Sequence, residues 1–152
     1  MYIWNIGALK KKLASERFSD KELIPYIVLY AALSVVGGEV SQYLSYEVDA
    51  WDYIGSVGAV IMTIAGTVYC YKCNGGKNGT NFLLKYFSIG FVIGVRFFVY
   101  LIPIGFLLGV YTGIVFGQEG HPTNFLDTLV MSCWYGIQYL LMAKHIGDTV
   151  VQ

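Results

Sequence analysis

Hydrophobic and polar positions follow one another along this chain in long blocks. Apolar stretches run over about 23–44, 51–71, 82–115 and 124–143, and short polar turns separate them. Each stretch has at least roughly the twenty residues that a helix needs to cross a bilayer core of about 30 Å. The pattern predicts an all-α fold, a polytopic membrane four-helix bundle that forms one domain over residues 1–152.

The third apolar stretch is longer than one membrane crossing requires. A continuous helix over residues 82–117 would measure about 54 Å, compared with a hydrocarbon core of about 30 Å. Pro103 lies within it, where a helix bends or breaks. We expect a tilted helix with a kink at the proline. The alternative is a break there, with residues 104–117 folding back as a partial span.

Residues 1–18 place apolar side chains on one side of a helix and basic side chains on the other. This pattern predicts a short amphipathic helix on the membrane surface, against anionic headgroups on the cytoplasmic side. The alternative is a solvated basic tail. The side chains expected at the lipid surface are Trp4, Lys10, Lys11, Lys12 and Arg17.

The distribution of lysine and arginine predicts the orientation. Basic residues precede the first span, flank the turn between the second and third spans, and follow the fourth. The other two turns carry acidic residues and no basic ones. The positive-inside rule therefore predicts that both termini are cytoplasmic, and short loops favour the bacterial inner membrane. A formal net charge of zero argues against a nucleic-acid partner.

Two charged residues lie inside predicted spans, Arg96 in the third and Glu39 in the first. An unpaired charge at that depth costs several kcal/mol, so each should face the protein interior or water and find a partner. Counting from the span ends places them at similar depths. We expect an Arg96–Glu39 pair, joined by Tyr100 one turn above the arginine. The pair would either fix helix register or form a substrate or ion site.

Glycines recur at intervals of four residues along the third stretch, and small residues at that spacing let two helix backbones approach closely. They indicate helix packing, either inside one bundle or as a glycine zipper between the subunits of a homo-oligomer or with partner helices. The residues concerned are Gly90, Gly94, Gly105, Gly109, Gly113 and Gly117.

Cys70 and Cys73 form a C-x-x-C motif at the inner end of the second span. A zinc site needs four ligands, and of the other candidates, Cys133, His121 and His145, two are expected to lie within the bilayer or on its far side. We therefore expect no metal and no cofactor. The motif resembles that of the quinone-coupled thiol oxidases of the bacterial inner membrane, four-helix proteins of comparable length. That resemblance implies a membrane thiol oxidoreductase as a third function.

The sequence contains no set of residues typical of soluble-type catalysis, so we do not expect an enzyme of that kind. The favoured function is a small oligomeric channel or transporter-like protein with an intramembrane charged site, because two charges exceed what anchoring requires. The alternative is a non-catalytic subunit or anchor that packs with the membrane helices of a larger complex.

Overall fold

The computed structural model describes residues 2, 4–15, 19–42, 48–116 and 125–150. Over these residues the protein is helical and contains no strand, which confirms the prediction of an all-α fold. The elements are α1 (Ile6–Ala14), α2 (Asp20–Gln42), α3 (Ala50–Cys73), the short 3-10 helix η1 (Gly76–Asn78), α4 (Phe82–Phe116) and α5 (Phe125–Gly147).

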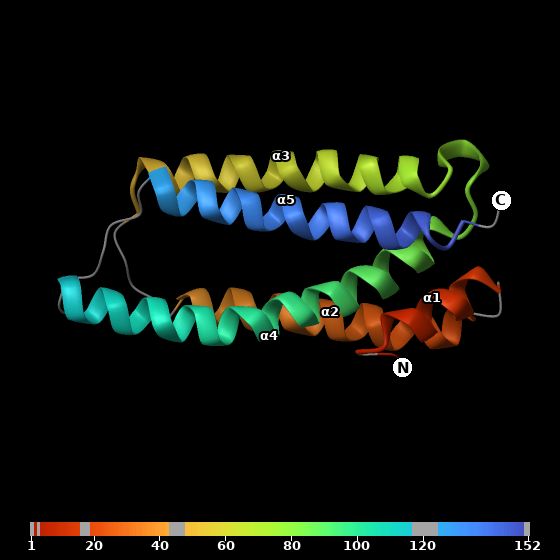
Figure 1. Ribbon diagram of the computed structural model, residues 1–152, viewed down its shortest axis with the longest axis horizontal. Helices are drawn as coiled ribbons and strands as arrows, with labels where there is room; N and C mark the ends of the chain where they lie inside the picture. Colours follow the sequence, from red (N-terminus) through yellow and green to blue (C-terminus); the bar gives the residue numbers. More distant parts are fainter. Residues whose placement is uncertain (1, 3, 16–18, 43–47, 117–124, 151–152) are drawn as a thin grey trace.

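The four long helices form two pairs. α3 lies along α5, α2 lies along α4, and α4 rises obliquely to meet α5 (Figure 1). The chain termini and η1 lie at one end of the molecule, together with α1. The helix pairs approach each other at this end and diverge toward the other (Figure 1).

α4 is a single helix that continues through Pro103. Its 35 residues correspond to about 52 Å at 1.5 Å per residue. The alternative of a break, with residues 104–117 folding back, is therefore wrong for the part of α4 that the structure describes. The helix runs obliquely to α5 (Figure 1), and its tilt and kink within a membrane stay predictions.

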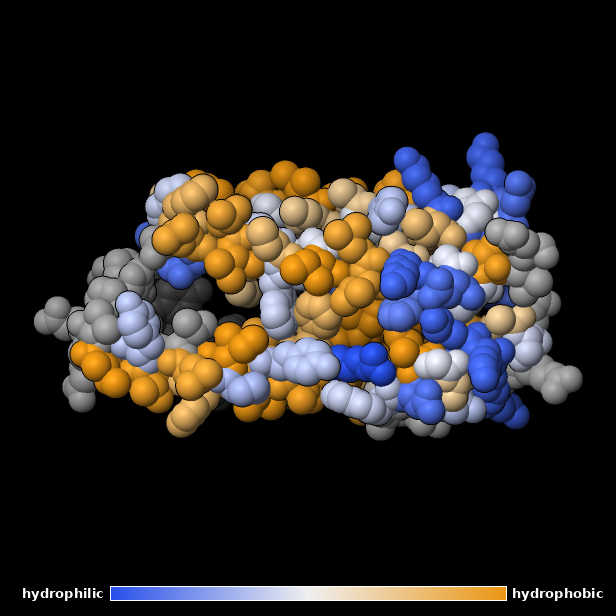
Figure 2. All heavy atoms as spheres, in the orientation of Figure 1, coloured by the Kyte–Doolittle hydropathy of each residue, from blue (hydrophilic) through white to orange (hydrophobic). Residues whose placement is uncertain are grey.

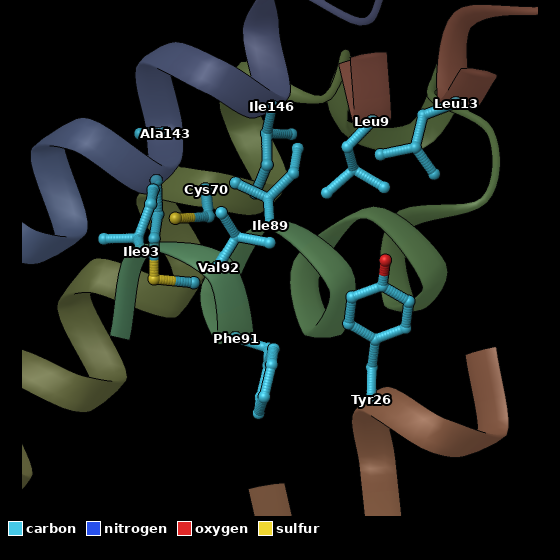
Figure 3. Close-up of a cluster of buried hydrophobic side chains, with 11 residues drawn as sticks. Leu9, Leu13, Tyr26, Cys70, Ile89, Phe91, Val92, Ile93, Ala143 and Ile146 are labelled. Atoms are coloured by element: carbon cyan, nitrogen blue, oxygen red, sulfur yellow. The ribbon is translucent and has the colours of Figure 1, made fainter. Parts of the chain in front are cut away.

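The buried core lies at the end that carries the termini. Leu9 and Leu13 of α1 point toward α4 and α5, where they meet Ile89 and Ile146 (Figure 3). Tyr26 of α2 packs edge-on against Phe91 of α4, with ring centroids 5.7 Å apart. The same cluster contains Cys70, Val92, Ile93, Met142 and Ala143. All five α-helices contribute to this cluster, so it joins the two pairs.

Small residues of α3 form the seam with α5. A methyl group at Gly66 would lie 2.3 Å from the ring of Tyr139, so the ring rests directly on the glycine backbone. Gly55 faces the methyl group of Thr128 less closely, since a Cβ atom added at Gly55 would lie at an ordinary contact distance of 3.7 Å from that methyl group. At the far end of the seam the rings of Trp51 and Phe125 meet at 5.6 Å.

The outer surface of the helices is largely apolar. Within the described residues, two helical segments, Ala50–Cys73 and Phe82–Leu107, are long and apolar enough to cross a membrane. The core helix of a soluble protein passes the same test, but such a helix is mostly buried. Here only 6% of the apolar stretch of the first segment and 28% of that of the second are buried inside the protein. Hydrophilic residues gather near the termini, and hydrophobic ones dominate the rest of the visible face (Figure 2).

We predict that Gly66→Ala destabilises the protein. The added methyl group overlaps the Tyr139 ring near its attachment point, so the helices must separate, at a cost of about 1–3 kcal/mol. The matched control is Gly136→Ala in α5, where nothing lies within 4 Å of the added carbon. Thermal unfolding in detergent, followed by circular dichroism, should show a lower Tm for the first variant and no loss for the second. Equal Tm values would contradict the described seam.

Candidate functional site

The guanidinium group of Arg96 contacts the segment that precedes α1. Its Nη2 donates a hydrogen bond to the backbone carbonyl of Trp4, and its Cζ lies 5.4 Å from the centroid of the Trp4 ring. Its Nε is buried and has no hydrogen-bond partner among the described residues. The polar partner expected for this arginine therefore comes from the N-terminal segment.

Neither Glu39 nor Tyr100 is a described partner of this guanidinium group. Glu39 is exposed on α2, and the described part of the chain contains no ion pair between it and Arg96. Tyr100 lines an apolar groove between α4 and α5, together with Phe97 and Trp134. Among the described residues, no hydrogen bond or ion pair joins Arg96, Glu39 and Tyr100 to one another.

The glycines of α4 have different neighbours along the helix. A methyl group at Gly90 would lie 2.8 Å from Cε of Met142, and one at Gly94 would lie 3.7 Å from Nε2 of Gln138. Both glycines therefore pack inside the bundle against α5. Gly105 has nothing within 4 Å. Gly109 and Gly113 continue α4, and Gly117 lies outside the described residues.

The apolar side of α1 covers the protein's own core, since Leu9 and Leu13 are buried in it. Nζ of Lys10 lies 2.8 Å from the carboxylate of Asp148, and Lys12 pairs with Glu22.

One of these contacts affects its acidic partner. The hydrogen bond from Lys10 lowers the pKa of Asp148. Lys11 remains exposed, and Arg17 lies outside the described residues. Contact between this basic surface and anionic lipid stays a prediction.

The three cysteines are free thiols at separate places in the fold. Cys70 is buried in the core cluster, Cys73 is half-buried, and Cys133 is exposed on α5. Over the described ranges, no three side chains of histidine, cysteine, aspartate or glutamate gather in a way that could hold a metal ion.

A cavity of about 480 Å³, open to the surface and lined by both polar and apolar residues, lies between the first halves of α3 and α5. Its wall on α3 includes Asp52 and Ser56, one turn apart, and its wall on α5 includes Thr128 and Ser132, also one turn apart. Asp52 closes a capping box with Asp49, since its Oδ2 accepts a hydrogen bond of 2.9 Å from the Asp49 backbone. The remaining lining residues are Trp51, Gly55, Ala59, Asp127, Met131 and Tyr135.

A second cavity, of about 270 Å³, lies deeper among α2, α3, α4 and α5. Tyr135 lines both cavities, so the two cavities lie next to each other along α5. Thr63 of α3 continues the polar side of that helix into the second cavity. Its other lining residues are Tyr30, Tyr86, Phe87, Gly90, Phe91, Gln138, Tyr139 and Met142. The two cavities form a row of polar groups that leads from the acidic end of the α3–α5 pair toward the core.

Sequence reasoning missed these residues because hydroxyl groups are common in membrane helices. One signal was present: Asp52, Ser56 and Thr63 follow one side of α3 at helical spacing. Thr128 and Ser132 do the same on α5. No protein-family model, curated protein or solved structure matches this chain. Its function is therefore inferred from the chemistry of the site.

We predict that Arg96 is coupled energetically to Trp4 and not to Glu39. In double-mutant cycles, Arg96→Leu with Trp4→Ala should give a coupling of about 0.5–1 kcal/mol, because either substitution alone already removes the contact between the ring and the guanidinium group. Arg96→Leu with Glu39→Gln should be additive within about 0.5 kcal/mol. The free energy of unfolding in SDS titrations measures both. A Glu39 coupling above about 1 kcal/mol would instead support the ion pair predicted from the sequence.

Proposed function

We propose that this protein is an integral membrane protein of four spans that admits a small solute through the polar cavities, as a channel or transporter does. The spans are α2, α3, α4 and α5. The described surface of α3 and of the outer half of α4 is covered with exposed apolar side chains. Monomeric soluble proteins rarely expose contiguous apolar patches of that extent. Contact with lipid tails would keep such an apolar surface away from water.

The proposed orientation places both termini in the cytoplasm, in a bacterial inner membrane. The basic residues of α1 lie at the end of the termini, and Lys72, Lys77 and Lys144 belong to segments at the same end. Asp49, Asp52 and Asp127 begin the helices at the other end. This separation of charge by ends is what the positive-inside rule describes.

The observation that carries the solute path is the sharing of Tyr135 between the two polar cavities. A hydroxyl group in hydrocarbon needs a hydrogen-bond partner, and neighbouring helix carbonyls often supply it. Ser132 satisfies its hydroxyl in that way, through the Thr128 carbonyl at 2.8 Å. The two carboxylates on the same walls are far more costly to keep away from water. Water in the first cavity would hydrate them and would give a polar solute access to the second.

We predict that water reaches this cavity at a depth where the outer surface contacts lipid. In a background with Cys73→Ala and Cys133→Ala, Ser56→Cys should react with a membrane-impermeant thiol reagent at least about tenfold faster than Val57→Cys, because a thiol ionises only where water is present. Val57 is the matched control, since it is adjacent in sequence and 60% exposed on the outer surface.

A second matched pair tests the other wall of the cavity. Ser132→Cys should react faster than Val130→Cys, and Val130 is 64% exposed on the outer surface of α5. Slow reaction at both serine positions would show a dry cavity and would overturn the solute path. Fast reaction at both valine positions would overturn the membrane location.

A second candidate function is a non-catalytic subunit that receives a partner's membrane helix. The observation in its favour is the groove of about 560 Å³ between α4 and α5, lined by apolar residues around Pro103, Ile104 and Ile137. Gly105 follows Ile104 in the chain, and nothing lies within 4 Å of a Cβ atom added there. A neighbouring helix backbone packs closely at such a position.

For this second function we predict that Gly105→Leu disrupts an assembly that Gly136→Leu leaves intact. Both glycines lie on helices with nothing within 4 Å of a Cβ atom, but only Gly105 belongs to the four-residue repeat of glycines along α4. Light scattering of the detergent-purified protein measures the oligomer mass. An unchanged mass for Gly105→Leu would argue against packing through this position.

A further inference from the structure

We infer that the solute of the deeper cavity is a compact organic cation, a substituted ammonium ion. This inference rests on the proposed function and names its substrate class. It depends on three properties of the deeper cavity and its surroundings: the aromatic groups that line it, the sign of the charges outside it, and its size.

Aromatic rings dominate the cavity wall. Four tyrosines, Tyr30, Tyr86, Tyr135 and Tyr139, reach it from three different helices, and two phenylalanines join them. The ring of Phe87 packs edge-on against Tyr30 and Tyr86, at 6.2 and 5.7 Å between centroids. The hydroxyl of Tyr86 lies 2.9 Å from that of Thr67. These contacts hold the rings in place. A ring face carries negative electrostatic potential, and several faces together recognise substituted ammonium ions.

The charges on the route to the cavity favour cations. Asp52 and Asp127 lie on the walls of the outer cavity, and among the described residues no lysine or arginine lines either cavity. A cleft lined by one sign of charge raises the local concentration of the opposite ion. The basic residues of α1 lie at the far end of the molecule (Figure 1). An anion approaching from the acidic end would be repelled.

The deeper cavity itself excludes inorganic ions and large ligands. No carboxylate of the described chain lines it, so a small metal cation would lose its hydration shell without gaining the oxygen ligands it needs. A substituted ammonium ion is less strongly hydrated and can spread its charge over the ring faces. The volume of about 270 Å³ lies just under the range of roughly 300–1,000 Å³ typical of sites for drug-sized molecules. The solute is therefore small.

The test compares choline with its uncharged isostere, 3,3-dimethylbutan-1-ol, by calorimetric titration of the whole chain in lipid nanodiscs. Choline should bind at least about tenfold more tightly, because only the charged molecule interacts with the ring quadrupoles. Tyr135→Leu should weaken choline binding by about tenfold, whereas Tyr135→Phe, which keeps the ring, should retain it. Tyr69→Leu is the control, since Tyr69 is exposed on α3 and lines neither cavity.

A further variant tests whether the acidic residues of the outer cavity attract the cation. Asp127→Asn should reduce the uptake rate of choline into proteoliposomes at low salt and have less effect at high salt, because screening weakens attraction at the mouth. Equal affinity for choline and the alcohol, or full choline binding by Tyr135→Leu, would overturn the cation assignment. Failure of choline to bind would overturn it as well. The cysteine labelling is independent of these measurements, so wet cavities without choline binding would leave the solute path standing.

Discussion

The arrangement depends on hydrophobic burial at one end of the molecule, where Leu9 and Leu13 of α1 meet side chains of α4 and α5. This cluster joins the α2–α4 pair to the α3–α5 pair, which diverge away from it (Figure 1). Full burial of a leucine is worth about 1.5–3 kcal/mol. The short N-terminal helix therefore stabilises the junction of the two pairs, although it adds little length.

Divergence of the pairs creates the space in which polar groups can be tolerated. Near the core, Met142 and Gly90 are in close contact, and little room remains. Farther along, Tyr135 and Ser132 of α5 face open volume. In lipid, such volume between helices is acceptable when water, solute or a partner fills it. The visible face is also hollowed between the pairs at the end away from the termini (Figure 2).

Helix type and helix ranges could be predicted from the sequence because long apolar blocks with polar turns leave few alternatives. The continuation of α4 through Pro103 was also the favoured prediction. The partner of Arg96 could not be predicted, because depth arguments compare spans and do not place the Trp4 carbonyl beside one. The contact between Gly66 and Tyr139 was hidden for a similar reason, since it depends on which sides of two helices face each other. The spacing of residues along one helix does not show which helix it packs against, or through which side.

The closure of the core by α5 has a consequence for biosynthesis. Leu9 is synthesised long before Ile146, yet both belong to one buried cluster. Under the proposed topology, α1 cannot reach its final neighbours until the fourth span has emerged from the ribosome. Its apolar side must be accommodated elsewhere during that interval, and the membrane surface is the nearest suitable place for an amphipathic helix. The nascent chain would then release that helix from lipid in its final folding step.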